Sequence, residues 1–86
     1  MSWSPAYTPT FRRDYKNLSH QNQRKVDGAI RDITNSDDPR MLGRLKLGKW
    51  HGVYGYDIGR DLRVFYSVEL RERSVVFLRC GSHAIY

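Results

Sequence analysis

Hydrophobic residues near the start of the chain recur at helical spacing. Phe11, Tyr15 and Leu18 follow one another at positions i, i+4 and i+7, which predicts one apolar stripe on a helix. Thr8 is suited to be the N-cap of this helix, and Pro9 then occupies the first helical position, where its missing N–H costs nothing. The first helix is therefore expected to begin directly after Thr8.

A second helix is predicted after Ser19, which can serve as its N-cap. Its inner face is expected to comprise Val26, Ala29, Ile30 and Ile33. The turn-forming run at 35–39 ends this helical half, and a short strand containing Trp3 and Tyr7 precedes it.

The second half of the chain changes to a period of two. Alternation predicts strands over 53–58, 62–70 and 74–80, joined by three-residue turns at 59–61 and 71–73. Because odd-numbered turns keep the apolar residues of all three strands on one face, four side chains are expected on the opposite face. These four are Arg63, Phe65, Phe77 and Arg79.

Together these elements predict a single α+β domain over residues 1–86. We expect a small antiparallel sheet, made of the N-terminal strand and the three-strand C-terminal meander, with the two-helix hairpin packed on one face. An 86-residue chain is too short for separate cofactor and substrate lobes. The other face of the sheet is expected to lie open.

Composition narrows the class of protein. A single cysteine indicates a reducing compartment, and no apolar run is long enough to span a bilayer, so a cytoplasmic protein without a membrane partner is expected. The formal net charge of +6 favours a polyanionic partner, either nucleic acid or an acidic protein, although many small domains carry such a charge for solubility alone.

The charge is unevenly distributed. Segment 39–56 contains no carboxylate, and its basic residues are Arg40, Arg44, Lys46, Lys49 and His51. Lys46 and Lys49 beside Trp50 offer cations for phosphates and a ring for base stacking. The alternative is a solvated loop that is anchored in the core by its apolar residues.

Arg63 and Arg79 are expected on neighbouring strands and on the same face. Two such guanidinium groups repel one another unless an anion lies between them, which favours an anion-binding role. The alternative is ion pairing of these arginines with Glu69, Asp57 or Asp61.

His83 follows the last predicted strand and is expected at the rim of the open face, where it could move protons near neutral pH. Cys80 and His83 have the spacing of metal ligands, but no second paired motif completes a zinc site. Cys80 is expected to point into the core. No metal or other cofactor is predicted, and metal-free chemistry is the more economical interpretation.

Four motifs in order along the chain resemble the RelE/ParE superfamily of toxins from type II toxin–antitoxin systems. They are Phe11-Arg-Arg-Asp-Tyr-Lys-Asn-Leu18, Leu45-x-x-x-Lys49-Trp50, Asp61-Leu-Arg-Val-Phe-Tyr66 and Arg79-Cys-Gly-Ser-His-Ala-Ile-Tyr86. The ending is most similar to the YafQ-like branch. The resemblance implies a ribosome-dependent, metal-independent mRNA endonuclease, in which the 2′-hydroxyl attacks the adjacent phosphate and translation is inhibited.

The resemblance also implies roles for individual residues. Arg63 matches the strand arginine that stabilises the scissile phosphate, His83 matches a C-terminal general acid or base, and Asp61 matches an orienting aspartate. Tyr86 lies where RelE members have a tyrosine that helps to activate the attacking hydroxyl. The expected RNA-binding residues are Lys46, Lys49, Arg44, His51 and Arg79. The alignment does not choose between Lys46 and Lys49 as the catalytic lysine.

Two departures from the YafQ-like pattern stand out. Asp57 occupies a position where those proteins tend to have another histidine, so a scheme with two histidines would require His51 to substitute, and Tyr86 stands in place of Phe. The alternatives are a ParE-like inhibitor of DNA gyrase and a non-catalytic RNA-binding module. The expected partners are mRNA in the ribosomal A site and an acidic antitoxin that covers Phe65, Phe77 and the site. Operator DNA would be contacted only through the antitoxin.

Overall fold

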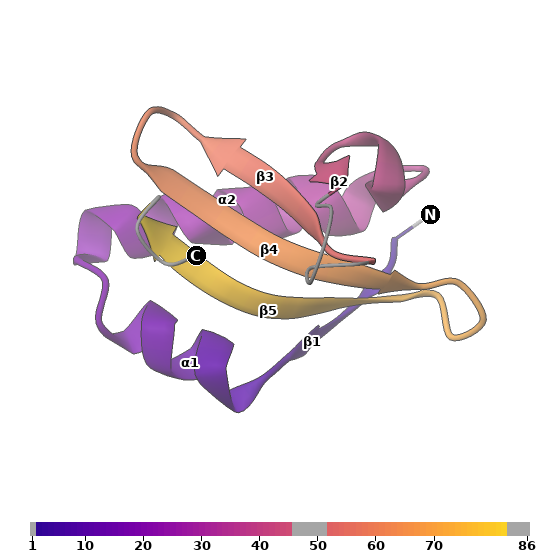
Figure 1. The fold of residues 1–86 in the computed structure, drawn as a ribbon, viewed down its shortest axis with the longest axis horizontal. Helices are drawn as coiled ribbons and strands as arrows, with labels where there is room; N and C mark the ends of the chain where they lie inside the picture. The colour runs from indigo at the N-terminus through magenta and orange to yellow at the C-terminus, as the bar shows by residue number, and fades with distance from the viewer. Residues whose placement is uncertain (1, 46–51, 83–86) are drawn as a thin grey trace.

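The computed structural model describes residues 2–45 and 52–82. In these ranges two α-helices cover one face of a five-stranded sheet, which is the α+β architecture expected from the sequence (Figure 1). The elements are β1 (Ser4–Tyr7), α1 (Pro9–Lys16), α2 (His20–Asn35), the 3₁₀ helix η1 (Pro39–Met41), β2 (Arg44–Leu45), β3 (Tyr54–Ile58), β4 (Leu62–Glu69) and β5 (Ser74–Ser82). Neither α-helix has the length and apolar character needed to cross a membrane.

Both helices begin where their capping residues predict. The Thr8 hydroxyl accepts a hydrogen bond from the Phe11 backbone N–H at 3.0 Å, and the Ser19 hydroxyl accepts one from the Asn22 N–H at 3.2 Å. These side chains satisfy N–H groups that have no partner within the first helical turn. Local chemistry alone therefore fixes the two helix starts.

The strand order is β1-β5-β4-β3-β2. β3, β4 and β5 form the expected antiparallel meander. Two features differ from the expectation: β1 pairs with β5 in parallel, which makes the sheet mixed, and the two-residue strand β2 adds to the far edge of β3. β1 can pair with β5 in parallel because a long connection, containing both helices and three strands, separates the two strands along the chain.

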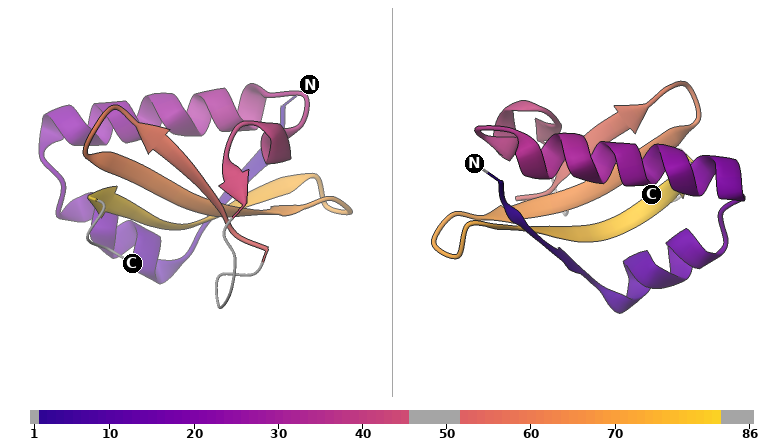
Figure 2. Two further views of the ribbon diagram at one scale, coloured as in Figure 1. Left: turned by 45° about the horizontal axis from the view of Figure 1, so that its top comes forward. Right: turned by 180° about the vertical axis from the view of Figure 1, so that it is seen from behind.

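The main hydrophobic core lies between the helices and the sheet. From behind, α2 crosses in front of the sheet, while α1 lies near the β1 and β5 side (Figure 2). The core residues are Trp3, Phe11, Val26, Ala29, Ile33, Leu62, Val64, Tyr66, Val75, Phe77 and Cys80. Aromatic rings link the layers, since the ring centroid of Phe77 lies 5.8 Å from that of Phe11 and 6.1 Å from that of Tyr66.

The turn between β4 and β5 is longer than predicted. Glu69 pairs with Ser74, so four residues, 70–73, form the turn, and Arg73 adopts a left-handed conformation with φ of 53°. The added residue shifts the register of β5 by one position against β4. As a result, Val75 and Phe77 point to the helical side of the sheet rather than to the opposite face.

A β-bulge then reverses this shift. Tyr66 pairs with Phe77, but the preceding residue, Phe65, pairs with Arg79, so Leu78 is an extra residue in β5. Beyond the bulge the predicted faces are restored: Cys80 lies in the core and Arg79 lies on the Phe65 side. The expectation that Phe77 lies on the open face is therefore wrong, whereas the placements of Arg79 and Cys80 are confirmed.

Candidate functional site on the sheet face opposite the helices

Arg63 lies on the face of the sheet that the helices do not cover. It pairs with Asp57 across β3 and β4, and its Nε donates a hydrogen bond to Asp57 Oδ1 at 2.5 Å. The two side chains differ in accessibility, because Arg63 is 16% exposed and Asp57 is 48% exposed. The site thus contains a largely buried guanidinium with a half-exposed carboxylate next to it.

Gly55 provides space for Phe65, which lies on the same face of β4 as Arg63. A Cβ atom built on Gly55 would be 3.2 Å from the Phe65 ring and 3.6 Å from Arg63 Cδ. Phe65 itself is fully buried, although it lies outside the core between the helices and the sheet. The missing side chain on β3 therefore allows Phe65 to pack close to the strand, whereas Arg63 would be in ordinary van der Waals contact with an added Cβ.

Arg79 has its own carboxylate partner on helix α1. Its Nε and Nη2 donate to the two oxygens of Asp14 at 3.0 and 3.1 Å, and the Cys80 backbone N–H donates to Asp14 Oδ2 at 3.3 Å. This contact raises the pKa of Arg79 above its ordinary value, chiefly through the hydrogen bond with Asp14. Asp14 thereby joins α1 to β5 just beyond the end of β1.

These contacts correct one step of the sequence argument. Repulsion between Arg63 and Arg79 does not require a bound anion, because each guanidinium already lies against a separate carboxylate. The ion-pairing alternative was right for Arg63 in naming Asp57. For Arg79 the actual partner, Asp14, was missed, because no local pattern relates the first helix to the last strand.

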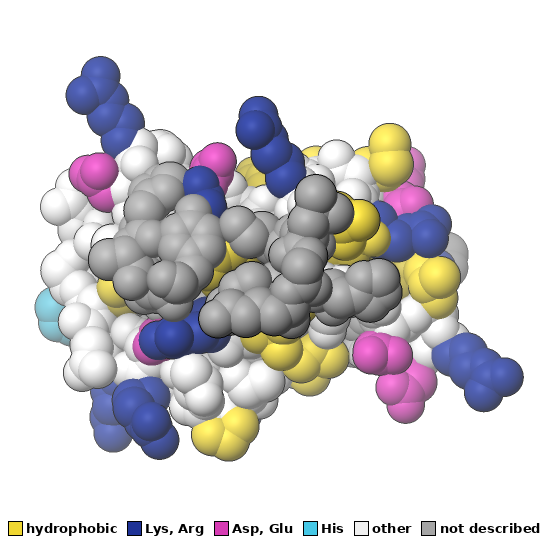
Figure 3. Space-filling view, in the orientation of Figure 1, with side chains coloured by type: hydrophobic (Ala, Val, Ile, Leu, Met, Phe, Trp, Pro, Cys, Tyr) yellow, Lys and Arg dark blue, Asp and Glu magenta, His cyan; other side chains and the backbone are white. Residues whose placement is uncertain are grey.

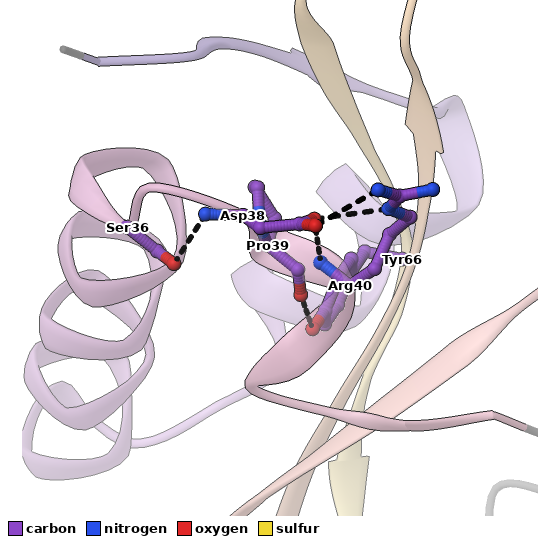
Figure 4. Close-up of polar contacts among 5 residues, drawn as sticks. All are labelled: Ser36, Asp38, Pro39, Arg40 and Tyr66. Atoms are coloured by element: carbon purple, nitrogen blue, oxygen red, sulfur yellow. Dashed lines mark hydrogen bonds and ion pairs between the residues drawn. The ribbon is translucent and has the colours of Figure 1, made fainter.

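One buried polar contact and several less buried ones anchor the start of segment 39–56. The hydroxyl of Tyr66, a fully buried residue, donates to the Pro39 carbonyl at 2.7 Å (Figure 4). Asp38 accepts from the Arg40 backbone N–H and guanidinium, and the Asp38 N–H donates to the Ser36 hydroxyl. Burial raises the pKa of Tyr66, so this phenol stays protonated and able to donate.

The remaining candidates are less enclosed or lie outside the described residues. Asp61 is exposed in the turn between β3 and β4, and Arg44 is exposed on β2. In the orientation of Figure 1, which looks onto the sheet from the side opposite α2, Lys and Arg side chains lie around much of the periphery of the molecule (Figure 3). The candidates outside the described residues are Lys46, Lys49, His51, His83 and Tyr86.

Among residues 2–45 and 52–82, no three His, Cys, Asp or Glu side chains come together as metal ligands. Cys80 is buried, and burial raises the pKa of its thiol to about 12. At neutral pH this thiol is protonated, which makes it a poor nucleophile. Cys80 is therefore a packing residue of the hydrophobic core.

A groove of about 690 Å³ lies between α1 and α2, away from Arg63. Aromatic and aliphatic side chains form part of its lining, and three cations, Arg12, Arg13 and Lys16, lie along it. Asp27 also lines the groove, where its carboxylate accepts a hydrogen bond from the Tyr15 hydroxyl at 2.8 Å.

A family model described as the ParE-like toxin of type II bacterial toxin–antitoxin systems matches residues 6–86. The chain belongs to this toxin family. Comparison with curated proteins gives no match.

Solved structures of toxins share the fold of this ParE-like toxin. A chain of the toxin–antitoxin complex RelBE2 from Mycobacterium tuberculosis superposes with a TM-score of 0.86 at 21% identity, covering 96% of this chain and all of that chain. The isolated RelE toxin of E. coli gives 0.78 at 11% identity, covering 94% and 84%. YafQ from E. coli strain BL21(DE3) gives 0.74 at 17% identity, covering 95% and 94%. At these identities the likeness establishes the fold of the toxin.

Proposed function

We propose that this toxin is a ribosome-dependent mRNA endonuclease of the cytoplasm that works without a metal ion and so inhibits translation. The 2′-hydroxyl of the nucleotide before the scissile bond attacks the adjacent phosphate, which yields a cyclic phosphate and a free 5′-hydroxyl. Arg63 stabilises the charge that develops on the phosphate. His83, Tyr86 and Asp61 are the proposed residues for proton transfer and orientation, and Lys46, Lys49, Arg44, His51 and Arg79 are proposed to bind RNA.

The main observation in favour is the position of Arg63. Its guanidinium lies on the sheet face that the helices do not cover, across from Asp57 on the neighbouring strand. Preorganised cations of this kind stabilise developing charge without reorganising during the reaction.

Cleavage of mRNA on programmed ribosomes tests the proposal. Arg63→Ala is expected to slow cleavage by about 10²–10³-fold, by analogy with the loss of one oxyanion-stabilising donor. Arg63→Lys keeps the stem and the charge and controls for folding. Arg60→Ala, in the exposed turn between β3 and β4, is the matched control and should cleave at the wild-type rate. The products should carry 2′,3′-cyclic phosphate and 5′-hydroxyl ends.

A second candidate function is inhibition of DNA gyrase, because the family model is named after ParE-like toxins. The same cells that express the toxin distinguish the two functions. Cleaved mRNA with intact DNA supports the endonuclease. DNA damage with intact mRNA, unaffected by Arg63→Ala, contradicts it and favours the gyrase inhibitor.

We also propose an acidic antitoxin as the partner, consistent with the RelBE2 neighbour, which is a toxin–antitoxin complex. The expectation that the antitoxin covers Phe65 and Phe77 is wrong, since neither side chain is exposed. The groove between α1 and α2 instead offers apolar surface beside cations, which suits an acidic amphipathic helix. Arg12→Glu combined with Arg13→Glu should weaken the complex, measured by calorimetry, while RNA cleavage stays unchanged.

A further inference from the structure

Asp57 contacts the arginine to which we assign the scissile phosphate, yet no role in the reaction has been given to it so far. It lies on β3 directly across from Arg63, and the contact joins its Oδ1 to Arg63 Nε. The pairing is fixed by the three-residue turn at 59–61, since Ile58 and Leu62 close the hairpin one step away. The carboxylate is therefore held in place by the backbone register as well as by the ion pair.

The geometry of the guanidinium determines what Asp57 meets when RNA binds. A guanidinium is planar and carries five N–H donors, and the contact with Asp57 engages the one on Nε. A phosphate bound to the same planar group lies beside the carboxylate. The 2′-hydroxyl that attacks this phosphate belongs to the adjoining ribose, so it is bound next to the same guanidinium.

Accessibility places the carboxylate on the substrate side of the pair. The Asp57 side chain is 48% exposed and the Arg63 side chain 16%, so an incoming strand reaches the carboxylate at least as readily as the guanidinium. A negative charge at this position repels the phosphate in the ground state. That cost is offset if the carboxylate accepts a proton as the reaction proceeds, because its charge is then neutralised as the charge on the phosphorane grows.

We propose that Asp57 is the general base of the cleavage reaction. The carboxylate takes the proton of the 2′-hydroxyl while the 2′-oxygen forms a bond to phosphorus. The bond from phosphorus to the 5′-oxygen then breaks, and the leaving 5′-oxygen takes a proton from the general acid of the proposed function, His83. Arg63 meanwhile keeps the carboxylate oriented through Nε and stabilises the phosphorane. This inference rests on the proposed endonuclease function.

The test compares single-turnover cleavage by the wild-type protein, Asp57→Asn, Asp57→Glu and Glu72→Gln on programmed ribosomes. Asp57→Asn keeps a carbonyl oxygen that accepts from Arg63 Nε but cannot take up the proton. It should slow cleavage at neutral pH by about 10²–10⁴-fold, which is the usual contribution of a general base. Asp57→Glu should retain most of the activity. Glu72→Gln removes the same charge from the exposed turn between β4 and β5 and should have no effect.

A pH series separates a catalytic role from a structural one. A reaction with a general base in place does not need hydroxide to remove the proton, whereas cleavage by a variant without the base depends on hydroxide. The ratio of the wild-type rate to the Asp57→Asn rate should therefore shrink by about tenfold for each pH unit. A constant ratio across the pH series overturns the proposal, as does unimpaired cleavage by Asp57→Asn. Absence of cleavage by the wild-type protein instead overturns the proposed function itself.

Discussion

The contact between Asp14 and Arg79 should contribute measurably to the packing of α1 against β5. Two hydrogen bonds join the side chains, which are 15% and 34% exposed, and Asp14 also accepts from the Cys80 N–H. Hydrogen bonds to charged groups contribute about 1.5–3 kcal/mol in enclosed sites. Solvent screening at the more exposed Arg79 reduces this, so we expect a coupling energy of about 1–2 kcal/mol.

Urea unfolding of Asp14→Ala, Arg79→Ala and the double variant measures this coupling as a double-mutant cycle. Asp14→Ala should lower the free energy of unfolding more than Arg79→Ala, because it also removes the acceptor of the Cys80 N–H. A cycle on the exposed Asp38–Arg40 pair serves as the control and should give a smaller coupling. If the two cycles agree, or if Asp14 and Arg79 are additive within about 0.5 kcal/mol, the contact does not hold α1 against β5.

Three further predictions concern the core, the support of the site and the response to pH. Tyr66→Phe removes the donor to the buried Pro39 carbonyl and should lower the free energy of unfolding by about 1–3 kcal/mol in urea titrations. Gly55→Ala should cost about 1–3 kcal/mol, because the added Cβ meets the buried Phe65 ring, and thermal unfolding reports it. Cys80 is protonated up to a pKa of about 12 when folded but ionises earlier when unfolded, so stability should fall above about pH 9, and Cys80→Ala should reduce this slope.

The helices could be predicted from the sequence because their signals are local. Thr8 and Ser19 cap the two helices within a few residues of the groups they satisfy, and the periodic apolar positions identify the buried stripe. The positions of β3, β4 and β5 could likewise be predicted from alternation, whereas β2 was not predicted. The assignment of β5 side chains to the two faces of the sheet could not be predicted, because it depends on the exact length of one turn and on a single extra residue.

Two irregularities that the sequence did not predict explain the outcome for β5. The predicted faces are right for Arg79 and Cys80 but wrong for Phe77. A four-residue turn moves Phe77 into the core, where its ring packs on Phe11 and Tyr66, and the extra residue Leu78 returns Arg79 to the other side. Neither the turn nor the bulge carries a distinctive motif here. Burial of a large aromatic ring in the core accounts for the register over the first part of the strand.

The two carboxylates of the arginine pairs differ in how far the sequence could have revealed them. Asp57 and Arg63 each lie one step beyond Ile58 and Leu62, the residues that close the hairpin, so the turn at 59–61 already predicts that they face each other. Asp14 reaches Arg79 only because α1 packs beside β5, and a separation of 65 positions leaves no periodic trace. Register therefore reveals cross-strand partners near a turn, whereas a contact between a helix and a strand edge requires the assembled fold. By this reasoning the general base proposed here was accessible from the sequence, and the residue that holds Arg79 was not.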